Sequence, residues 1–239
     1  MPNEILRSAL FNARNRNQPR RYFKNEAIAI IDQSARITFT GEELRQNDES
    51  VWLQLIHLAK EVPIGSPVEF TAYSMVQALR VTKSKPNPGH IERLCESLRR
   101  MQATSLAIHS KRLARGVSLS MIPKFEWQDE TTGARLAKWR VFVAPEMVEL
   151  FGDVHFTHLQ WEQRLALPSG LATWMHGYLA SHRAPVPIKL NTLQRGCGCN
   201  TVKPRKFKQL VSIALSELQR VGFLRNGAIR GELIHVERI

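Results

Sequence analysis

The stretch Lys203–Ile239, KPRKFKQLVSIALSELQRVGFLRNGAIRGELIHVERI, contains the clearest structural pattern in the chain. Its first half predicts a helix over Lys203–Val221, because apolar side chains recur from Phe207 to Leu218 at i, i+3, i+4, i+7, i+8 and i+11. Pro204 suits the first turn of such a helix. The second half predicts a β-hairpin, with strands at 223–225 and 233–236 and a turn at Asn226-Gly227.

The elements before this stretch predict a repeated order. A helix at 169–182, a short strand at 187–190, a brief helix capped by Asn191 and a glycine loop at 196–200 precede the basic helix. The first half of the chain repeats that order: a helix that Asp48 or Ser50 caps and Pro63 ends, a strand at 68–70, a helix from the N-cap Thr71 to Leu79, a loop at 83–89, a helix at 90–102, and strands at 105–110, 117–127 and 136–143.

Repetition of element order indicates two related domains. We predict an α+β fold of two tandem winged-helix (winged helix-turn-helix) domains with an N-terminal basic arm. Residues 1–21 form the arm, 22–145 the first domain and 146–239 the second. A further hairpin is expected at 22–31 and 35–40.

Composition and charge favour a polyanionic partner. The chain has 34 Lys and Arg against 21 Asp and Glu, a net charge of +13, and 43% hydrophobic residues, enough for packed cores. No apolar run reaches the ~20 residues of a membrane span, and the N-terminus does not resemble a signal peptide. Three cysteines favour a reducing compartment, so we expect a cytoplasmic protein.

The basic start of the last helix is the strongest functional signal. Cations in a first turn oppose the helix dipole, and a bound phosphate backbone would neutralise them. Arginine can donate to guanine and glutamine can pair with adenine in the major groove. The alternative is an ordinary solvated face. The predicted DNA-binding residues of this helix are Lys203, Arg205, Lys206, Lys208, Gln209 and Ser212.

The first domain shows a similar but weaker pattern, diluted by Glu92 and Glu96. Hairpin wings usually contact phosphates or the minor groove, so basic wing residues should add affinity more than specificity. Ion pairs within the helix are again the alternative. The predicted DNA-binding residues are Lys83, Lys85, His90, Arg93 and Arg100 around the helix, Lys111 and Arg112 in the first wing, and Arg225 and Arg230 in the second.

No residue pattern supports catalysis or a cofactor. The phosphate-binding loop of nucleotide hydrolases is absent, and the pair His155 and His158 has no third metal ligand nearby in sequence. A nickase would need a nucleophilic tyrosine such as Tyr178. Cys197 and Cys199 form a lone C-x-C, which favours a flexible loop with free thiols over zinc. We therefore expect no enzyme activity, no metal and no cofactor.

The arm contains a second candidate site, Arg7-Ser8-Ala9-Leu10-Phe11. A short segment ending in Leu10-Phe11 could dock in the hydrophobic pocket of a partner. Alternatively, these apolar residues anchor the arm to its own domain.

The chain resembles the TrfA replication initiators of broad-host-range plasmids. The residues that carry the resemblance are Ile5–Phe11 (ILRSALF), Phe39–Leu44 (FTGEEL), Asp48–Leu58 (DESVWLQLIHL) and Val68–Ala72 (VEFTA). The resemblance implies a plasmid replication initiator that binds repeated origin sites (iterons) in double-stranded DNA as a monomer, helps to open adjacent AT-rich DNA, and recruits the host initiator, the replicative helicase and the sliding clamp. Dimers in this family tend to be inactive and to limit copy number, which implies a self-dimer as a further partner.

Two departures from the family pattern bear on these expectations. In the family's clamp-binding motif, Gln-Leu-Ser/Asp-Leu-Phe, only Leu10 and Phe11 match, and Arg7, Ser8 and Ala9 depart. The chain also begins without the long N-terminal extension of some members, so contacts carried by that extension are expected to be missing. The alternative function is a winged-helix transcriptional repressor that binds a palindromic operator as a dimer.

Overall fold

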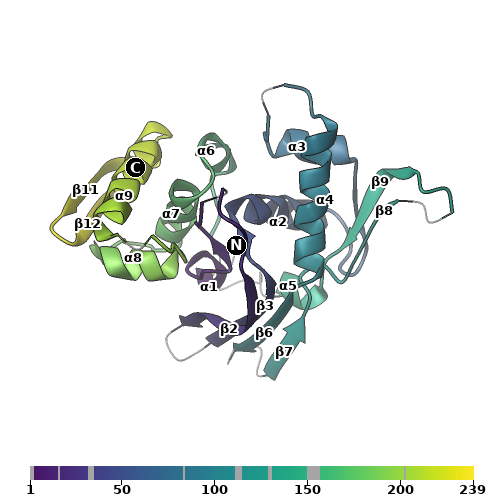
Figure 1. The fold of residues 1–239 in the computed structure, drawn as a ribbon, viewed down its shortest axis with the longest axis horizontal. Helices are drawn as coiled ribbons and strands as arrows, with labels where there is room; N and C mark the ends of the chain where they lie inside the picture. The colour runs from purple at the N-terminus through teal and green to yellow at the C-terminus, as the bar shows by residue number, and fades with distance from the viewer. Residues whose placement is uncertain are drawn as a thin grey trace. The chain divides into compact units, whose positions relative to one another are not determined.

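Short antiparallel sheets and helices alternate along the chain in the computed structural model (Figure 1), which describes residues 3–15, 17–31, 35–82, 84–110, 115–128, 131–149, 157–201 and 203–239. The chain divides into two units. Residues 22–152 form one, and residues 153–239 together with residues 1–21 form the other. The boundary after residue 152 lies seven residues beyond the predicted one.

The unit of residues 22–152 contains a winged helix. Thr71 accepts a hydrogen bond from the Ser74 backbone N–H (2.9 Å), which confirms the predicted N-cap. The three-stranded sheet has the order β5-β9-β8, so the first strand pairs with the last. In chain order the elements are α2 (Gln46–Ala59), β5 (Val68–Phe70), α3 (Ala72–Ala78), α4 (Pro88–Gln102), β8 (Lys124–Gln128), β9 (Arg135–Phe142) and α5 (Pro145–Glu149).

The same unit carries a separate four-stranded sheet of order β2-β3-β6-β7. Its strands are β2 (Tyr22–Ile31), β3 (Ala35–Glu42), β6 (Ser105–Ser110) and β7 (Arg115–Leu119), and the two-residue strand β4 (Leu44–Arg45) follows β3. The strand predicted over 117–127 is therefore two strands in two sheets. Between the two strands, the Ser120 hydroxyl donates a hydrogen bond to the Gln102 carbonyl oxygen (2.7 Å), and Pro123 directly precedes β8.

The wing of the first domain is consequently the hairpin β8–β9, not the connection that contains Lys111 and Arg112. Those two residues lie between β6 and β7 and outside the described residues. The prediction placed the wing in the first pair of strands after α4, which is β6–β7. In the structure β5 pairs with β9, so the later hairpin β8–β9 belongs to the winged-helix sheet.

The other unit repeats the winged-helix order with a sheet of order β10-β12-β11. Figure 1 shows the hairpin β11–β12 beside α9 at the C-terminal end of the chain. The matching strand order in the two sheets agrees with the predicted repetition. The elements are α1 (Asn3–Leu6), β1 (Phe11–Asn12), α6 (Trp161–Ala166), α7 (Leu171–Ala180), β10 (Ile188–Lys189), α8 (Leu190–Gly196), α9 (Pro204–Arg220), β11 (Leu224–Arg230) and β12 (Leu233–Arg238).

The apolar stripe of α9 forms much of this unit's core. Phe207, Val211 and Leu218 are buried against side chains from α7, α8 and the hairpin, while Leu210 is half-buried. In the described part of the chain, no helix combines the length and apolar character that crossing a membrane requires.

The turn of the second hairpin lies at Gly231-Glu232, not at Asn226-Gly227. Arg230 pairs with Leu233 across the turn, and Gly231 has a positive φ of 60°, as two-residue turns with glycine first require. Gly227 instead lies within β11, where a Cβ atom would approach Leu215 Cδ2 to 3.0 Å. The Asn-Gly pair therefore marks close packing of the strand on α9.

The first 21 residues do not form a separate arm, because they cluster with residues 153–239. Trp174 Nε1 donates a hydrogen bond to the Ser8 carbonyl oxygen (3.2 Å), and Arg7 Nε donates to Ser181 Oγ (2.9 Å). Gly177 leaves room for Leu6, whose Cδ2 would lie 2.8 Å from an added Cβ. A few apolar residues within a polar segment are enough to hold it on α7.

Candidate nucleic-acid interface

The start of α9 presents cations that nothing else in the helix offsets. Lys203 is the N-cap and makes no side-chain capping bond, Pro204 follows, and the first turn contains no acidic residue. Lys203, Arg205 and Lys206 are exposed, and Lys208 is half-buried. The positive end of the helix dipole lies at the same place, so these charges destabilise the free helix.

These cations also lack carboxylate partners. In the part of the chain that the structure describes, no Asp or Glu forms an ion pair with Lys203, Arg205, Lys206 or Lys208. Lys206 Nζ donates to Gln209 Oε1 (3.1 Å), and Lys208 Nζ donates to the Gly231 carbonyl oxygen (3.0 Å). The second of these bonds ties the helix to the tip of the wing.

The exposed face of α9 presents the predicted base-reading residues together. Arg205, Gln209 and Ser212 are all exposed and lie on the side opposite the buried stripe. The Ser212 hydroxyl donates to the Lys208 carbonyl oxygen (3.1 Å). The face therefore offers a guanidinium, an amide and a hydroxyl at helical spacing.

Ile213 adds an apolar group to this face that the sequence analysis missed. Its side chain is 53% exposed, although it lies in the middle of an otherwise apolar run, VSIAL. The signal was present, because Ile213 falls outside the spacing of the buried stripe and next to Gln209 on the helix surface.

The two predicted arginines of the second wing differ in their surroundings. Arg225 Nη1 pairs with Glu237 Oε1 at 2.9 Å across the hairpin. Arg230 is exposed beside the Gly231 turn and has no ion-pair partner in the described part of the chain. Arg230 is thus the more available of the two for a phosphate.

The predicted residues at the start of α4 are partly used by the helix itself. Asn87 is the N-cap and accepts the His90 N–H (3.1 Å), while the His90 ring Nδ1 accepts the Asn87 N–H (3.2 Å). His90 therefore completes a capping box. Lys85 is exposed in the preceding loop, and Lys83 lies outside the described residues.

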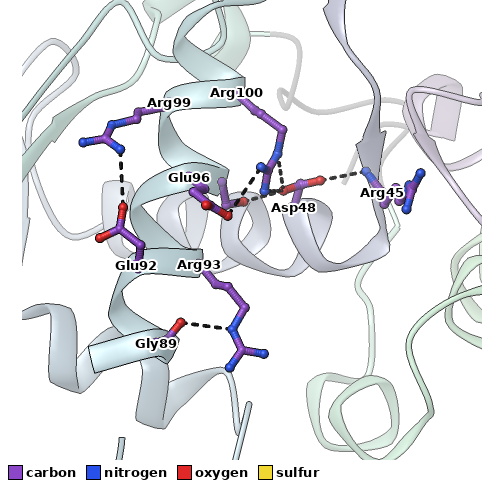
Figure 2. A network of polar contacts seen from close by, with 9 residues as sticks. Arg45, Asp48, Gly89, Glu92, Arg93, Glu96, Arg99 and Arg100 are labelled. Carbon is purple, nitrogen blue, oxygen red and sulfur yellow. Dashed lines mark hydrogen bonds and ion pairs between the residues drawn. The ribbon is translucent and has the colours of Figure 1, made fainter. Parts of the chain in front are cut away.

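The arginines of α4 all have partners within their own domain, as Figure 2 shows. Arg93 Nε donates to the Gly89 carbonyl oxygen (3.0 Å), and Arg99 pairs with Glu92 at 3.4 Å. Arg100 pairs with the fully buried Asp48 at 3.0 Å and is itself only 14% exposed.

Arg100 is therefore a structural residue, not the DNA contact predicted from sequence. The Asp48 carboxylate also accepts hydrogen bonds from Ser97 Oγ (2.6 Å) and the Arg45 backbone N–H (2.8 Å). A buried carboxylate needs such partners, and Arg100 supplies the counter-charge. Helical spacing placed Arg100 on the face of α4 opposite its apolar residues, which predicted exposure. It could not predict that α2, which carries Asp48, packs beside Arg100.

The observed wing of the first domain contains basic residues that the sequence analysis did not single out. Each of them lies within ion-pair distance of a carboxylate: Lys124 and Arg140 contact Glu126, Arg140 and Lys138 contact Glu69, and Arg135 contacts Glu92. The alternation of basic and apolar residues over 135–142 (RLAKWRVF) could have indicated a strand with one basic face. The basic residues of this wing thus have carboxylate partners, whereas the cations at the start of α9 have none among the described residues.

Leu10 and Phe11 are not presented for docking in this structure. They are 3% and 2% exposed, so the rest of the chain already covers them. Of the two alternatives drawn from sequence, anchoring of these side chains matches the structure.

The residues that a nickase would need include the pair His155 and His158 and the candidate nucleophile Tyr178. No group of three or more His, Cys, Asp or Glu side chains gathers among the described residues, and His155 lies outside them. Tyr178 stacks on Trp174 with ring centroids 4.8 Å apart, and burial raises the pKa of its hydroxyl. Tyr178 is half-buried and packs against the core of its unit.

The fold and this interface define a class: a tandem winged-helix protein whose second helix-turn-helix carries an unbalanced basic face. The chain belongs to the TrfA protein family, whose model matches residues 1–238. A relative in Escherichia coli, named plasmid replication initiator protein TrfA, is 35% identical over 239 residues. The match covers all of this chain and 61% of that protein, so the chain spans less than two thirds of its relative's length.

Two solved structures share the fold. A crystal structure of domains 2 and 3 of RctB superposes with a TM-score of 0.67 at 11% sequence identity, covering 100% of this chain and 98% of that one. A second structure of RctB domains 2-3 gives a TM-score of 0.64 at 11% identity, with 99% and 97% covered. At such low identity the likeness confirms the tandem winged-helix fold alone.

Proposed function

We propose that this chain is a plasmid replication initiator that binds repeated origin sites in double-stranded DNA. The observation that carries the proposal is the start of α9, where Lys203, Arg205 and Lys206 are exposed and have no carboxylate partner among the described residues. A phosphate backbone supplies the missing negative charge. Membership of the TrfA family supports the role in replication.

In this proposal α9 enters the major groove and reads bases. Arg205 donates two hydrogen bonds to a guanine, Gln209 pairs with an adenine, and Ile213 contacts a thymine methyl group. Lys203, Lys206 and Lys208 contact flanking phosphates, and Arg230 of the wing contacts the backbone or minor groove.

The first domain contributes affinity more than sequence readout. Its helix and wing carry arginines and lysines that are already paired with Glu69, Glu92 and Glu126. Exchange of these pairs for phosphates gains less than neutralisation of an unpaired cation. Lys85 and Arg93 are the residues of this domain that we assign to phosphate contacts.

Two non-identical modules on one chain suit an asymmetric site that one monomer occupies. Directly repeated copies of such a site would each bind one chain, without the two-fold symmetry of a dimeric repressor. We further propose that binding helps to open adjacent AT-rich DNA and recruits the host initiator, the replicative helicase and the sliding clamp. The name and family of the relative support a role in replication initiation, and clamp contact through Leu10 and Phe11 would require their exposure.

A DNase footprint across the DNA of the chain's own replicon tests this proposal. Protection of several directly repeated sites beside an AT-rich stretch is the expected result, and Arg205→Ala should lose that protection at protein concentrations where Arg220→Ala keeps it. Arg220 is the matched control because it lies at the far end of α9 and pairs with Glu217. A single protected palindrome at a promoter would overturn the initiator and favour a repressor.

A further inference from the structure

The exposed face of α4 carries carboxylates, unlike the basic start of α9. Glu92, Glu96 and Arg99 are all exposed and follow one another at spacings of four and three residues, which places them along one side of the helix. On α9 the first acidic residue is Glu217, near the far end. Because a carboxylate repels phosphates, the two glutamates reduce the attraction between this face of α4 and DNA.

Glu92 contacts one arginine of its own helix and one arginine of the wing. Its Oε1 atom lies 3.4 Å from Arg99 Nη1 (Figure 2), and its Oε2 atom lies 3.6 Å from Nη2 of Arg135, the first residue of β9. All three side chains are about half-exposed, so both guanidinium groups are within reach of an external phosphate. One carboxylate thus pairs with two cations at the junction of α4 and the wing.

A tryptophan of the wing also contacts Arg99. The guanidinium carbon lies 5.1 Å from the centre of the Trp127 ring, and Trp127 stacks on Phe125 with ring centroids 4.4 Å apart. Glu92, Arg99, Trp127 and Arg135 line the same small hollow between α4 and the hairpin β8–β9. The cation–π contact adds to the ion pair, so Arg99 is held from two sides.

Glu96 offers a comparison on the same face of α4. It is exposed, and its carboxylate lies 4.0 Å from Arg100. Arg100 is already paired with the buried Asp48 at 3.0 Å, so removal of the Glu96 charge leaves Arg100 with a partner. Replacement of Glu92 or Glu96 by glutamine changes the net charge equally, whereas Glu92→Gln releases two arginines.

We propose that Glu92 limits the affinity of the first domain for DNA by keeping Arg99 and Arg135 from phosphates. The inference rests on the proposed function, since it assumes that α4 and its wing face a duplex. A phosphate that approaches either arginine competes with the Glu92 carboxylate and is repelled by it. The first domain then binds any duplex weakly, and sequence discrimination is left to α9. Glu92 is a positioning residue, because it acts through the two arginines.

The variant Glu92→Gln tests the proposal in the full chain, with Glu96→Gln as the matched control. Association constants are measured over a range of salt concentrations for a duplex that carries one footprinted repeat and for an unrelated duplex of the same length. Glu92→Gln should bind both duplexes several-fold more tightly, and its salt slope should be steeper by roughly 1.8, which is 0.9 for each released arginine. Glu96→Gln should have a smaller effect on affinity and leave the slope unchanged. Equal slopes and affinities for the two variants would overturn the proposal.

Two further results separate release of the arginines from other roles of Glu92. In a chain that already carries Arg99→Gln and Arg135→Gln, Glu92→Gln should affect binding no more than Glu96→Gln does, because no cation remains to be released. A full effect in that background would mean that the Glu92 charge acts alone. A change at the repeat without a change on the unrelated duplex would mean that Glu92 reads a base, such as the amino group of a cytosine. Either result would overturn the proposal.

The contacts of Glu92 are measured without DNA by ¹⁹F NMR of the chain labelled with 5-fluorotryptophan. The Trp127 signal is assigned with Trp127→Phe. Glu92→Gln should shift this signal, because Arg99 loses the carboxylate that holds it at the ring, and Glu96→Gln should not. An unshifted signal in Glu92→Gln would overturn the proposal. Failure of the wild-type chain to bind either duplex would instead count against the proposed function, and a shifted Trp127 signal would still show that Glu92 holds Arg99.

Discussion

At the scale of single residues, Arg205 of α9 and Arg93 of α4 are both predicted DNA contacts but have different surroundings. Arg205 has no carboxylate partner in the described part of the chain, whereas Arg93 donates to the Gly89 carbonyl oxygen. Arg205→Ala should cost about 1–3 kcal/mol of binding free energy and relax specificity at one base pair. Arg93→Ala should weaken all sites by a smaller, uniform amount. Dissociation constants of both variants for a panel of single-base variants of the site measure these effects. If Arg205→Ala weakens binding to all of these sites equally, Arg205 contacts a phosphate and not a base.

Ile213 should recognise a thymine through its methyl group. Removal of the partner methyl, by replacement of one thymine with uracil, should weaken wild-type binding by roughly 0.8 kcal/mol, or about fourfold. Ile213→Ala should bind the two DNAs equally well, because the contact is already lost. Competition binding with each thymine replaced in turn finds the position. Ile213→Ala retaining the full uracil penalty at every position would exclude the contact.

His176 should make the folding of its unit depend on pH. It is fully buried, its Nε2 lies 3.4 Å from Gln163 Oε1, and burial with the nearby Arg164 charge lowers its pKa to about 3. The unfolded chain, with a pKa near 6.5, binds the proton first, so stability is lost as the pH falls below about 6.5. Between pH 7 and pH 5 the free energy of unfolding should fall by about 2 kcal/mol more in wild type than in His176→Gln.

Urea denaturation at pH 7, 6 and 5 measures this difference. Both proteins lose stability through other groups, so the comparison isolates His176. Parallel pH profiles for the two proteins would show that the imidazole gains a proton without cost in the folded chain.

At the scale of elements, the buried pair Asp48–Arg100 connects α2 to α4. Asp48 is fully buried, and its oxygen atoms also bind Ser97 and the Arg45 backbone. Asp48→Ala leaves the Arg100 charge without its partner and should lower the free energy of unfolding by about 3–5 kcal/mol. Glu96→Gln, which removes an exposed and longer contact to Arg100, should cost less than about 1 kcal/mol. Equal effects in urea denaturation would contradict the structural role of Arg100.

The elements differed in how far sequence could predict them. The helices α2, α3, α4, α7, α8 and α9 and the strand at 68–70 follow from apolar periodicity and from caps such as Thr71, because those signals are local, whereas the short helices α1, α5 and α6 were not predicted. The choice of wing is not local, since it depends on β5 pairing with β9 across about seventy residues. The prediction of a turn at Asn226-Gly227 was wrong for a related reason. Glycine occurs both in turns and where elements pack closely, and only the position of Leu215 on α9 shows that Gly227 serves close packing.

The difference between local signals and contacts remote in sequence also explains which residues of the candidate site could be predicted. The basic start of α9 was predictable because Lys203–Lys208 are neighbours in sequence and their cost to the helix is local. The role of Arg100 was not, because Asp48 lies fifty-two residues away. The burial of Leu10 and Phe11 also depends on residues remote in sequence.

At the scale of the whole molecule, the net charge of +13 should appear as a steep salt dependence of DNA binding. The logarithm of the association constant should fall linearly with the logarithm of salt concentration, by about 0.9 per neutralised phosphate. The double variant Lys203→Gln, Lys206→Gln should reduce this slope by roughly 1.8. Arg220→Gln, at the other end of α9 and paired with Glu217, should leave the slope unchanged. Equal slopes for all three proteins would remove the two lysines from the phosphate contacts.

The most direct test of the central claim, that one chain reads one asymmetric site with α9 as the base-reading helix, is a methylation-interference map of a single repeat. Methylation at guanine N7 blocks the major-groove edge that arginine reads. For wild type we expect clusters of interfering guanines without two-fold symmetry, and for Arg205→Ala the loss of interference at one guanine only. Two symmetry-related clusters that each lose a guanine in Arg205→Ala would show a symmetric dimer on a palindrome and contradict the account.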